Sequence, residues 1–373
     1  MKDHRQALAE LLGRARQAEA KRLQDWERAQ HWVVCGMGTQ GQKVAAALAA
    51  RGKQVRAFID AKARTGDVLN TIPCWPKDAL PPEIREGAAV IVAIHNPVFD
   101  TLSAREELVA LGYGEVWLLQ ELVDAMPELE QYWLAPSRRV TAAEDAAAAG
   151  LALLDDEASR DLYLAVLGFR LLGLPCPAPE PGQYFPDTIP ALNAPLRWVD
   201  CGAYIGDTLD YVEAEQIPSA WCAAFEPDPK NFTQLAAKHS GAAQLIPCGV
   251  ADRMAMAHFS ADGSSGKICT DGAAGATFVQ LVSLDDCLGA APINFVKMDI
   301  EGAELAALEG ARRIVGEQNP RLALSTYHAP EHLWAVAQKA VEVGFRGRWM
   351  LRAHACNTFE VVAYGLPEGE EAS

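Results

Sequence analysis

Two segments of the chain share a pattern that few folds accommodate: an apolar strand runs into a glycine turn, and a helix follows. They read HWVVCGMGTQGQKVAAAL at residues 31–48 and RWVDCGAYIGDTLDY at residues 197–211. Strand, glycine turn and helix in this order are typical of the first βα unit of a parallel, doubly wound sheet. The sequence therefore predicts two such sheets, each with its own glycine turn.

The segments after each glycine turn continue the alternation of strand and helix patterns, from Trp32 to about Leu122 and again from Leu196 almost to the end. Such alternation predicts an α/β fold with mostly parallel sheets. One strand is expected at AQLIPCGV, residues 243–250. The final pair, RWMLRAH and TFEVVAYG, is separated by only residues 355–357, so it should be antiparallel, because parallel strands need a dozen or more connecting residues.

A proline-rich segment divides the two alternating regions. Seven prolines between Gly173 and Pro195 exclude a helix or a central strand there. We therefore expect two domains in the 373 residues. The expected divisions are an N-terminal amphipathic helix at 1–30, a smaller Rossmann-like domain at 31–123, a helical and Pro-rich connector at 124–195, a larger doubly wound domain at 196–366 and an acidic tail at 367–373.

Composition excludes several classes of protein. A net charge of −16 argues against a nucleic-acid or anionic-membrane partner, since both require a basic surface. There is no run of about 18 apolar residues and no apolar core of a signal peptide at the N-terminus. Nine scattered cysteines without a C-x-x-C pair are typical of free thiols in a reducing compartment. We expect a cytoplasmic protein that can form a homodimer.

The second glycine turn, VDCGAYIGDT, lacks the G-x-G-x-x-G spacing and carries an acid two residues before its first glycine. Gly202 and Gly206 would let a ligand approach the backbone closely, and Asp207 or Thr208 would cap the helix. Asp200 would repel a pyrophosphate and favour a cation. We therefore expect S-adenosylmethionine, which carries a sulfonium and an ammonium group, along Asp200 and residues 202–206.

The ends of the later strands add further candidate side chains. Glu226 ends the next strand, 24 residues after Gly202, where a carboxylate can accept hydrogen bonds from two ribose hydroxyls. Lys297 and Asp299 lie two apart in NFVKMDIEG and should share one face of their strand. A lysine inside an apolar strand needs a partner. Tyr327 and His328 should face the same crevice from the next strand.

Residues 196–366 resemble the FkbM family of S-adenosylmethionine-dependent methyltransferases. The resemblance rests on YFPDTIPAL, VDCGAYIGDT, FEPDPKNF, NFVKMDIEGAELAALEGA, LALSTYHAPEHLW and LRAH…TFEVVAYG, in the order of the family. It implies a class I methyltransferase fold with an antiparallel last strand, and O-methylation of a hydroxyl on a sugar, nucleotide sugar, glycan or secondary metabolite. The expected cofactor-binding residues are Asp200, Gly202, Ala203, Tyr204, Gly206, Thr208, Glu226 and Asp252.

Three catalytic arrangements remain open from the sequence. Asp299, kept ionised by Lys297, is the first candidate for the base that removes the hydroxyl proton. His328 is the second, because its ordinary pKa suits neutral pH. In the third, Asp299, Glu301 and His328 bind a divalent cation such as Mg²⁺ that lowers the pKa of the hydroxyl. His332, His239 and His258 are expected to be structural.

The first glycine turn, VCGMGTQG, has the G-x-G-x-x-G spacing of a dinucleotide site at Gly36, Gly38 and Gly41. Asp60 ends the next strand, 24 residues after Gly36. The segment also resembles the N-terminal Rossmann-like domain of some FkbM-type enzymes. It predicts either a nucleotide or nucleotide-sugar site or a scaffold without a ligand. The alternative functions are a nucleotide-binding regulatory protein and an NAD(P)-dependent enzyme, the latter disfavoured because the chain has no Tyr-x-x-x-Lys pair.

Overall fold

The computed structural model describes residues 3–260, 267–269, 277–289 and 291–369, so the expected acidic tail lies outside the described residues from position 370 onward. The chain forms two compact units, each built from separate stretches of sequence. The N-terminal unit comprises Met1–Ala148, Asp161–Pro179 and Ala355–Glu360. The C-terminal unit comprises Ala149–Arg160, Glu180–His354 and Val361–Ser373.

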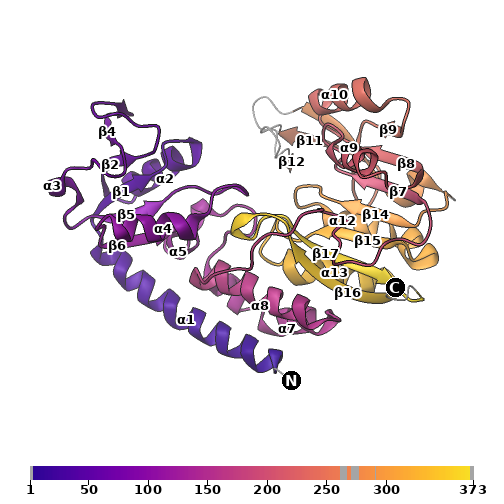
Figure 1. Cartoon of the computed structure of the whole chain (residues 1–373), viewed down its shortest axis with the longest axis horizontal. Helices are drawn as coiled ribbons and strands as arrows, with labels where there is room; N and C mark the ends of the chain where they lie inside the picture. The colour runs from indigo at the N-terminus through magenta and orange to yellow at the C-terminus, as the bar shows by residue number, and fades with distance from the viewer. Residues whose placement is uncertain (1–2, 261–266, 270–276, 290, 370–373) are drawn as a thin grey trace. The chain divides into compact units, whose positions relative to one another are not determined.

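The N-terminal unit contains a six-stranded sheet in the order β3-β4-β2-β1-β5-β6 (Figure 1). Its strands are β1 His31–Cys35, β2 Gln54–Ile59, β3 Val68–Leu69, β4 Ile72–Trp75, β5 Ala89–Val92 and β6 Glu115–Leu118. All pairs are parallel except β3 with β4. The strand order reverses between β1 and β5, which is where ligands bind in doubly wound folds.

Helices surround this sheet and extend the unit. The expected N-terminal helix is α1, His4–Arg28, with Asp3 accepting a hydrogen bond from the Gln6 backbone as its cap. The following helical segments are α2 Thr39–Ala50, α3 Pro82–Arg85, α4 Thr101–Ala110, α5 Leu119–Leu122, η1 Pro127–Leu129, α6 Ser137–Thr141, α7 Glu144–Leu153, α8 Glu157–Leu172 and, near the end of the chain, η3 Cys356–Thr358. Residues 149–153 of α7 and 157–160 of α8 belong to the C-terminal unit. No helix among the described residues has both the length and the apolar composition needed to cross a bilayer.

The C-terminal unit contains a seven-stranded sheet in the order β16-β17-β15-β14-β7-β8-β9. Its strands are β7 Leu196–Cys201, β8 Ser219–Phe225, β9 Gln244–Ile246, β14 Phe295–Met298, β15 Arg321–Ser325, β16 Gly347–Ala353 and β17 Val361–Pro367. β17 is antiparallel to both β15 and β16, as expected from the short turn between the last two strands. The order reverses between β7 and β14. The helical segments of this unit that follow β7 are α9 Asp207–Ala214, α10 Pro229–His239, α11 Leu284–Leu288, α12 Glu304–Glu309, η2 Ile314–Gln318 and α13 His332–Glu342.

A second, smaller sheet in this unit was not expected. Its order is β10-β13-β11-β12, with β10 Cys248–Val250, β11 Ala255–Ser260, β12 Lys267–Cys269 and β13 Thr277–Val282. The single strand expected at residues 243–250 is therefore wrong. Pro247 divides it into β9 and β10, which belong to different sheets, and proline cannot supply the N–H that a continuous ladder needs.

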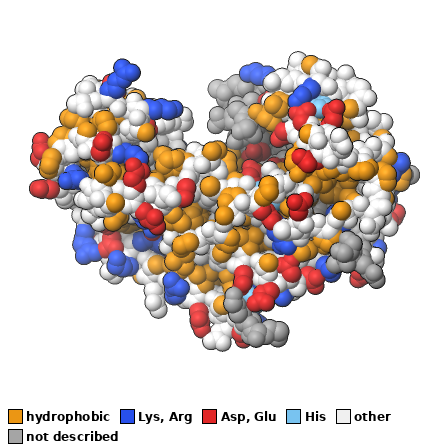
Figure 2. Space-filling view, in the orientation of Figure 1, with side chains coloured by type: hydrophobic (Ala, Val, Ile, Leu, Met, Phe, Trp, Pro, Cys, Tyr) orange, Lys and Arg blue, Asp and Glu red, His pale blue; other side chains and the backbone are white. Residues whose placement is uncertain are grey.

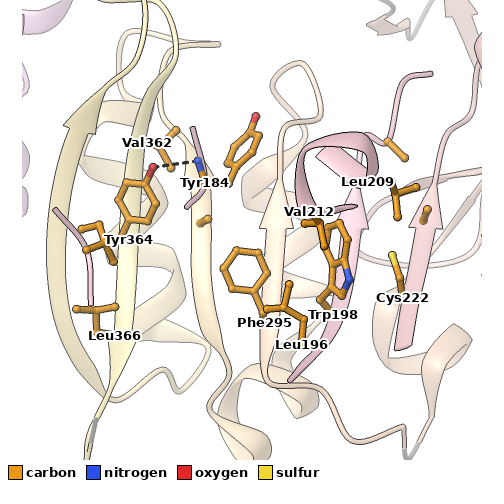
Figure 3. Close-up of a cluster of buried hydrophobic side chains, with 14 of the residues drawn as sticks. Tyr184, Leu196, Trp198, Leu209, Val212, Cys222, Phe295, Val362, Tyr364 and Leu366 are labelled. Carbon is orange, nitrogen blue, oxygen red and sulfur yellow. Dashed lines mark hydrogen bonds between the residues drawn. The ribbon is translucent and has the colours of Figure 1, made fainter. Parts of the chain in front are cut away.

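Large aromatic residues form the core on one face of the seven-stranded sheet (Figure 3). Trp198 of β7, Phe295 of β14 and Tyr364 of β17 are almost fully buried there. The Pro-rich segment joins them: Tyr184 and Ile189 are buried in the same cluster. The boundary expected at residue 195 thus moves to about residue 180, because the end of the expected connector packs as part of this unit.

Acidic and basic side chains are interspersed with apolar ones on the face of the chain that Figure 2 shows.

Candidate active site

The glycine turn after β7 is shaped by packing. Gly202 has a φ of +84°, and a Cβ added to it would lie 1.9 Å from the Asp299 carbonyl oxygen. Gly206 has a φ of +93°, and a Cβ there would lie 2.4 Å from the His239 ring. Both positions require glycine because a side chain would be strained and would collide with its neighbours. This requirement is independent of the close ligand approach expected from the sequence.

Glu226, at the carboxyl end of β8, folds back onto this turn. Its Oε2 accepts a hydrogen bond of 2.9 Å from the Tyr204 N–H, and its Oε1 accepts one of 2.8 Å from the Asp228 N–H. Burial raises the pKa of Glu226 to about 7, against the opposing effect of these two backbone hydrogen bonds. A carboxylate has about four acceptor sites, so it can take two further donors.

Lys297 has the partner that its place in an apolar strand requires. Its Nζ lies 2.9 Å from Asp200 Oδ1 and donates a 2.7 Å hydrogen bond to the Gly202 carbonyl. The two residues are opposite each other in the β7–β14 ladder, and both are buried. Burial alone would lower the pKa of Lys297, but the charges of Asp200, Asp299 and Asp207 raise it above its ordinary value. The cation that Asp200 attracts is therefore Lys297.

Asp299 follows β14, accepts hydrogen bonds from two tyrosine side chains and forms an ion pair with a histidine. Tyr184 Oη lies 2.6 Å from Oδ2, and Tyr327 Oη lies 3.2 Å from Oδ1. His328 Nε2 also lies 3.2 Å from Oδ1. Burial alone would raise the pKa of Asp299, but the hydrogen bond and charge of His328, with help from Lys297, hold it well below its usual range.

His328 lies between two carboxylates. Its Nε2 faces Asp299, and its Nδ1 lies 2.7 Å from Oε1 of the fully buried Glu304. His332 Nδ1 lies 3.2 Å from the other Glu304 oxygen. Burial would lower the pKa of His328, but Glu304 and Asp299 raise it well above its ordinary value. Both ring nitrogens then carry protons, and the imidazolium links the two carboxylates.

Three of these side chains also have the spacing of a metal site, although they differ from the expected set. The ligand atoms of Asp299, Glu304 and His328 lie within 4.8 Å of one another. Glu301, expected in place of Glu304, has Oε2 4.0 Å from His328 Nε2. Because each nitrogen of His328 faces a different carboxylate, the described arrangement matches a protonated imidazole more closely than a single metal ion.

Comparison with known proteins identifies this region. Residues 200–350 match the family model described as methyltransferase FkbM domain. The chain carries an FkbM methyltransferase domain. The match begins at Asp200 and includes Glu226, Asp299, Glu304 and His328.

The fold of nearly the whole chain also occurs in a solved structure. The crystal structure of methyltransferase FkbM from Methylobacillus flagellatus KT superposes with a TM-score of 0.79 over 97% of this chain and 100% of that chain, at 20% sequence identity. At this identity the likeness establishes the fold. A putative rRNA-methylase from Clostridium thermocellum covers 45% of this chain and 84% of its own at 12% identity, with a TM-score of only 0.27. A comparison with curated protein sequences finds no match.

An FkbM methyltransferase domain implies S-adenosylmethionine as the methyl donor. Glu226 fits that molecule, because a buried carboxylate with spare acceptor capacity at the end of β8 suits ribose hydroxyls. Asp200 fits less directly than expected, since Lys297 already meets its charge. Of the acids that surround His328, Asp299 and Glu301 retain exposure, with side chains 22% and 21% exposed, whereas Glu304 is fully buried.

The other expected cofactor residues lie in or near the turn, with one exception. Ala203 is buried, Tyr204 has a φ of +48°, and Thr208 is buried in the first turn of α9. Asp252 instead lines a surface hollow with residues of α12 and α13 and pairs with Arg253 at 2.8 Å. Roles for these four residues stay predictions.

Sequence reasoning missed three members of the cluster. Tyr184 lies in the segment interpreted as a connector, although the family-like YFPDTIPAL was a signal for it. Glu304 is not among the residues that the sequence singles out, and His332 was expected to be structural. The spacing of His328 and His332, four residues apart, was the available signal, because both reach the same carboxylate.

The N-terminal unit repeats one detail of the FkbM domain. Asp60, at the end of β2, accepts a 3.0 Å hydrogen bond from the Met37 N–H in the glycine turn, as Glu226 does from Tyr204. A Cβ added to Gly41 would lie 1.9 Å from the Gly36 carbonyl oxygen, while one added to Gly38 would meet nothing within 4 Å. Gly41 thus serves the packing of α2 on β1, and a nucleotide at this turn stays a prediction.

Proposed function

We propose that the FkbM domain transfers a methyl group from S-adenosylmethionine to a hydroxyl oxygen of a small-molecule or carbohydrate acceptor. The observation that carries the proposal is the set of three donors around the Asp299 carboxylate at the switch point between β7 and β14. A partly exposed, ionised carboxylate in that position can accept the proton of a neutral hydroxyl. Tyr184 and Tyr327 fix its orientation.

The donor would be held by Glu226 at its ribose and by the turn at residues 202–206. When bound, it supplies a methyl carbon activated by the sulfonium. Lys297 ties Asp200 to the Gly202 carbonyl and so holds the turn in its present form. The Lys297–Asp200 pair therefore supports the donor site through the backbone of the turn.

Asp299 orients the acceptor hydroxyl and removes its proton late in the reaction. The pKa of Asp299 lies below its usual range, so this carboxylate is a weak base toward a free alcohol. An oxygen that has begun to bond to the methyl carbon is far more acidic than a free hydroxyl. A weak base is then sufficient, and the Asp299 carboxylate contributes mainly by aligning the acceptor hydroxyl with the methyl carbon.

His328 acts through Asp299 and Glu304. Each nitrogen faces a carboxylate and the raised pKa keeps the ring protonated, so it has no lone pair to accept a proton, which argues against its role as the rival base. Its charge keeps Asp299 ionised, and Glu304 keeps His328 protonated. Glu304 and His332 are therefore positioning residues for the carboxylate that faces the acceptor.

The test is a transfer assay with S-adenosylmethionine and a panel of sugars, nucleotide sugars and hydroxylated small molecules, with release of S-adenosylhomocysteine as the readout. Wild-type protein should methylate at least one hydroxyl, and Asp299→Asn should not reach the wild-type rate while still binding the donor. The exposed Glu215→Gln serves as a matched loss of one acid and should have no effect. Equal rates for Asp299→Asn and wild type would contradict the proposal.

A further inference from the structure

Arg170, in α8 of the N-terminal unit, is a buried cation without an acidic partner. The residue is only 4% exposed. Its Nε donates a 3.1 Å hydrogen bond to Thr358 Oγ1 and its Nη2 a 3.3 Å bond to the Thr358 carbonyl, whereas its Nη1 has no partner. Among the described residues of the chain, no carboxylate forms an ion pair with this guanidinium. A buried charge is costly unless an opposite charge and hydrogen bonds compensate it.

Two further buried nitrogens near Arg170, one in Trp133 and one in His95, also lack partners. The Arg170 guanidinium carbon lies 5.4 Å from the centroid of Trp133, whose own Nε1 has no acceptor. The His95 ring lies 4.9 Å from the Trp133 ring, and its Nε2 is also without a partner. Burial and the nearby charge of Arg170 lower the pKa of His95 to about 3, so this histidine is neutral.

The cluster lies at the ligand-binding edge of the N-terminal sheet. His95 follows β5, and Ala93, two residues before it, donates a 2.9 Å hydrogen bond to the Cys35 carbonyl at the end of β1. Ile94 packs against Gly36 of the first glycine turn. These contacts place His95 beside the reversal in strand order between β1 and β5. The same loop continues to Val98, which is 84% exposed.

We infer that Arg170, Trp133 and His95 form a binding site for an oxyanion, a phosphate or carboxylate group of a small ligand, in the N-terminal unit. Arginine and tryptophan side chains only donate hydrogen bonds, so the missing partner must offer acceptor oxygens. A guanidinium is suited to two oxygens of one anion. The site is separate from the methyl-transfer centre and independent of the function proposed for it.

Replacing Arg170 separates a ligand site from a structural contact. If Arg170 is a binding residue for an anion, its charge is uncompensated without the ligand. Arg170→Met should then unfold in chloride buffer at a denaturant concentration equal to or higher than that of wild type. Arg352 provides the matched control, since it is buried and pairs with Asp156 at 3.1 Å. Arg352→Met should be destabilised in every buffer, because its substitution leaves the charge of Asp156 uncompensated.

The binding experiment uses calorimetry and thermal unfolding of the full chain at constant ionic strength. The probes are inorganic phosphate, a nucleoside diphosphate and succinate. At least one should stabilise wild type and bind at least tenfold more weakly to Arg170→Met, with Trp133→Phe intermediate and Glu215→Gln unchanged. The probe that binds with the highest affinity shows whether the site prefers a free phosphate, a nucleotide or a carboxylate. Equal stabilisation of wild type and Arg170→Met by all three probes, or destabilisation of Arg170→Met in chloride buffer, would overturn the inference.

Discussion

Lowering the pH from about 8 to about 6 should weaken the binding of S-adenosylmethionine about tenfold, because Glu226 must be ionised to accept two ribose hydrogen bonds. Burial raises the pKa of this carboxyl to about 7. With that value the ionised fraction is about ten-elevenths at pH 8 and about one-eleventh at pH 6. The ratio of about ten corresponds to about 1.4 kcal/mol of binding free energy.

Isothermal titration calorimetry in buffers of different ionisation enthalpy measures this effect directly. Wild type should release close to one proton on binding the donor at pH 6 and almost none at pH 8. Glu226→Gln should bind at least about tenfold more weakly at pH 8 and lose the pH dependence that Glu226 causes. Any pH dependence that remains in the variant comes from the donor's own titration and is subtracted from the wild-type curve. A wild-type affinity that stays constant over this range would refute the assignment of Glu226 to the ribose.

The raised pKa of Glu226 also makes the stability of the donor-free protein depend on pH. An acid whose pKa is higher in the folded than in the unfolded state favours folding when it is protonated. The contribution of Glu226 is therefore full below pH of about 4.5 and is lost as the pH rises to about 7. Addition of the donor should offset this loss.

Four further outcomes follow from the Asp299 cluster. Asp299→Asn should lower turnover by about 10²–10⁴-fold while donor affinity, measured by calorimetry, stays unchanged. Tyr184→Phe should lower turnover less, because Tyr327 and His328 still contact Asp299; a loss as large as that of Asp299→Asn would contradict a purely orienting role. Glu304→Gln should destabilise the fold by about 3–5 kcal/mol in urea titrations. The Glu304–His328 ion pair contributes fully to the free energy of unfolding between pH of about 4.5 and 6.5. This contribution is lost in acid, where Glu304 becomes protonated, and in base, where the pH exceeds the raised pKa of His328. A chelator should leave turnover unchanged, whereas loss of activity that Mg²⁺ restores would favour the metal arrangement.

Local patterns predicted the strands and glycine turns because each depends on a few neighbouring residues. Periodicity located β7, β8 and β14, and chemistry showed that Lys297 needs a partner. The identity of that partner follows from the register of β14 on β7, which pairs Lys297 with Asp200 across almost a hundred residues of chain. Register of this kind is set by tertiary packing, which no single segment specifies.

The parts that sequence reasoning missed depend on long-range contacts. Tyr184 reaches Asp299 across 115 residues, from a segment whose prolines indicate only the absence of regular structure. The second sheet is built partly from three-residue strands, which are too short for a periodic signal. Glu304 has no local signal, because its histidine partners lie in a different loop and helix.

The most direct test of the account is transfer of a trideuterated methyl group from labelled S-adenosylmethionine, followed by mass spectrometry of the acceptor panel. The account predicts that wild type places the label on a hydroxyl oxygen, and that Asp299→Asn binds the donor normally but transfers it at most about one-hundredth as fast. Label found only on nitrogen or carbon, or an Asp299→Asn variant that transfers as fast as wild type, would contradict it.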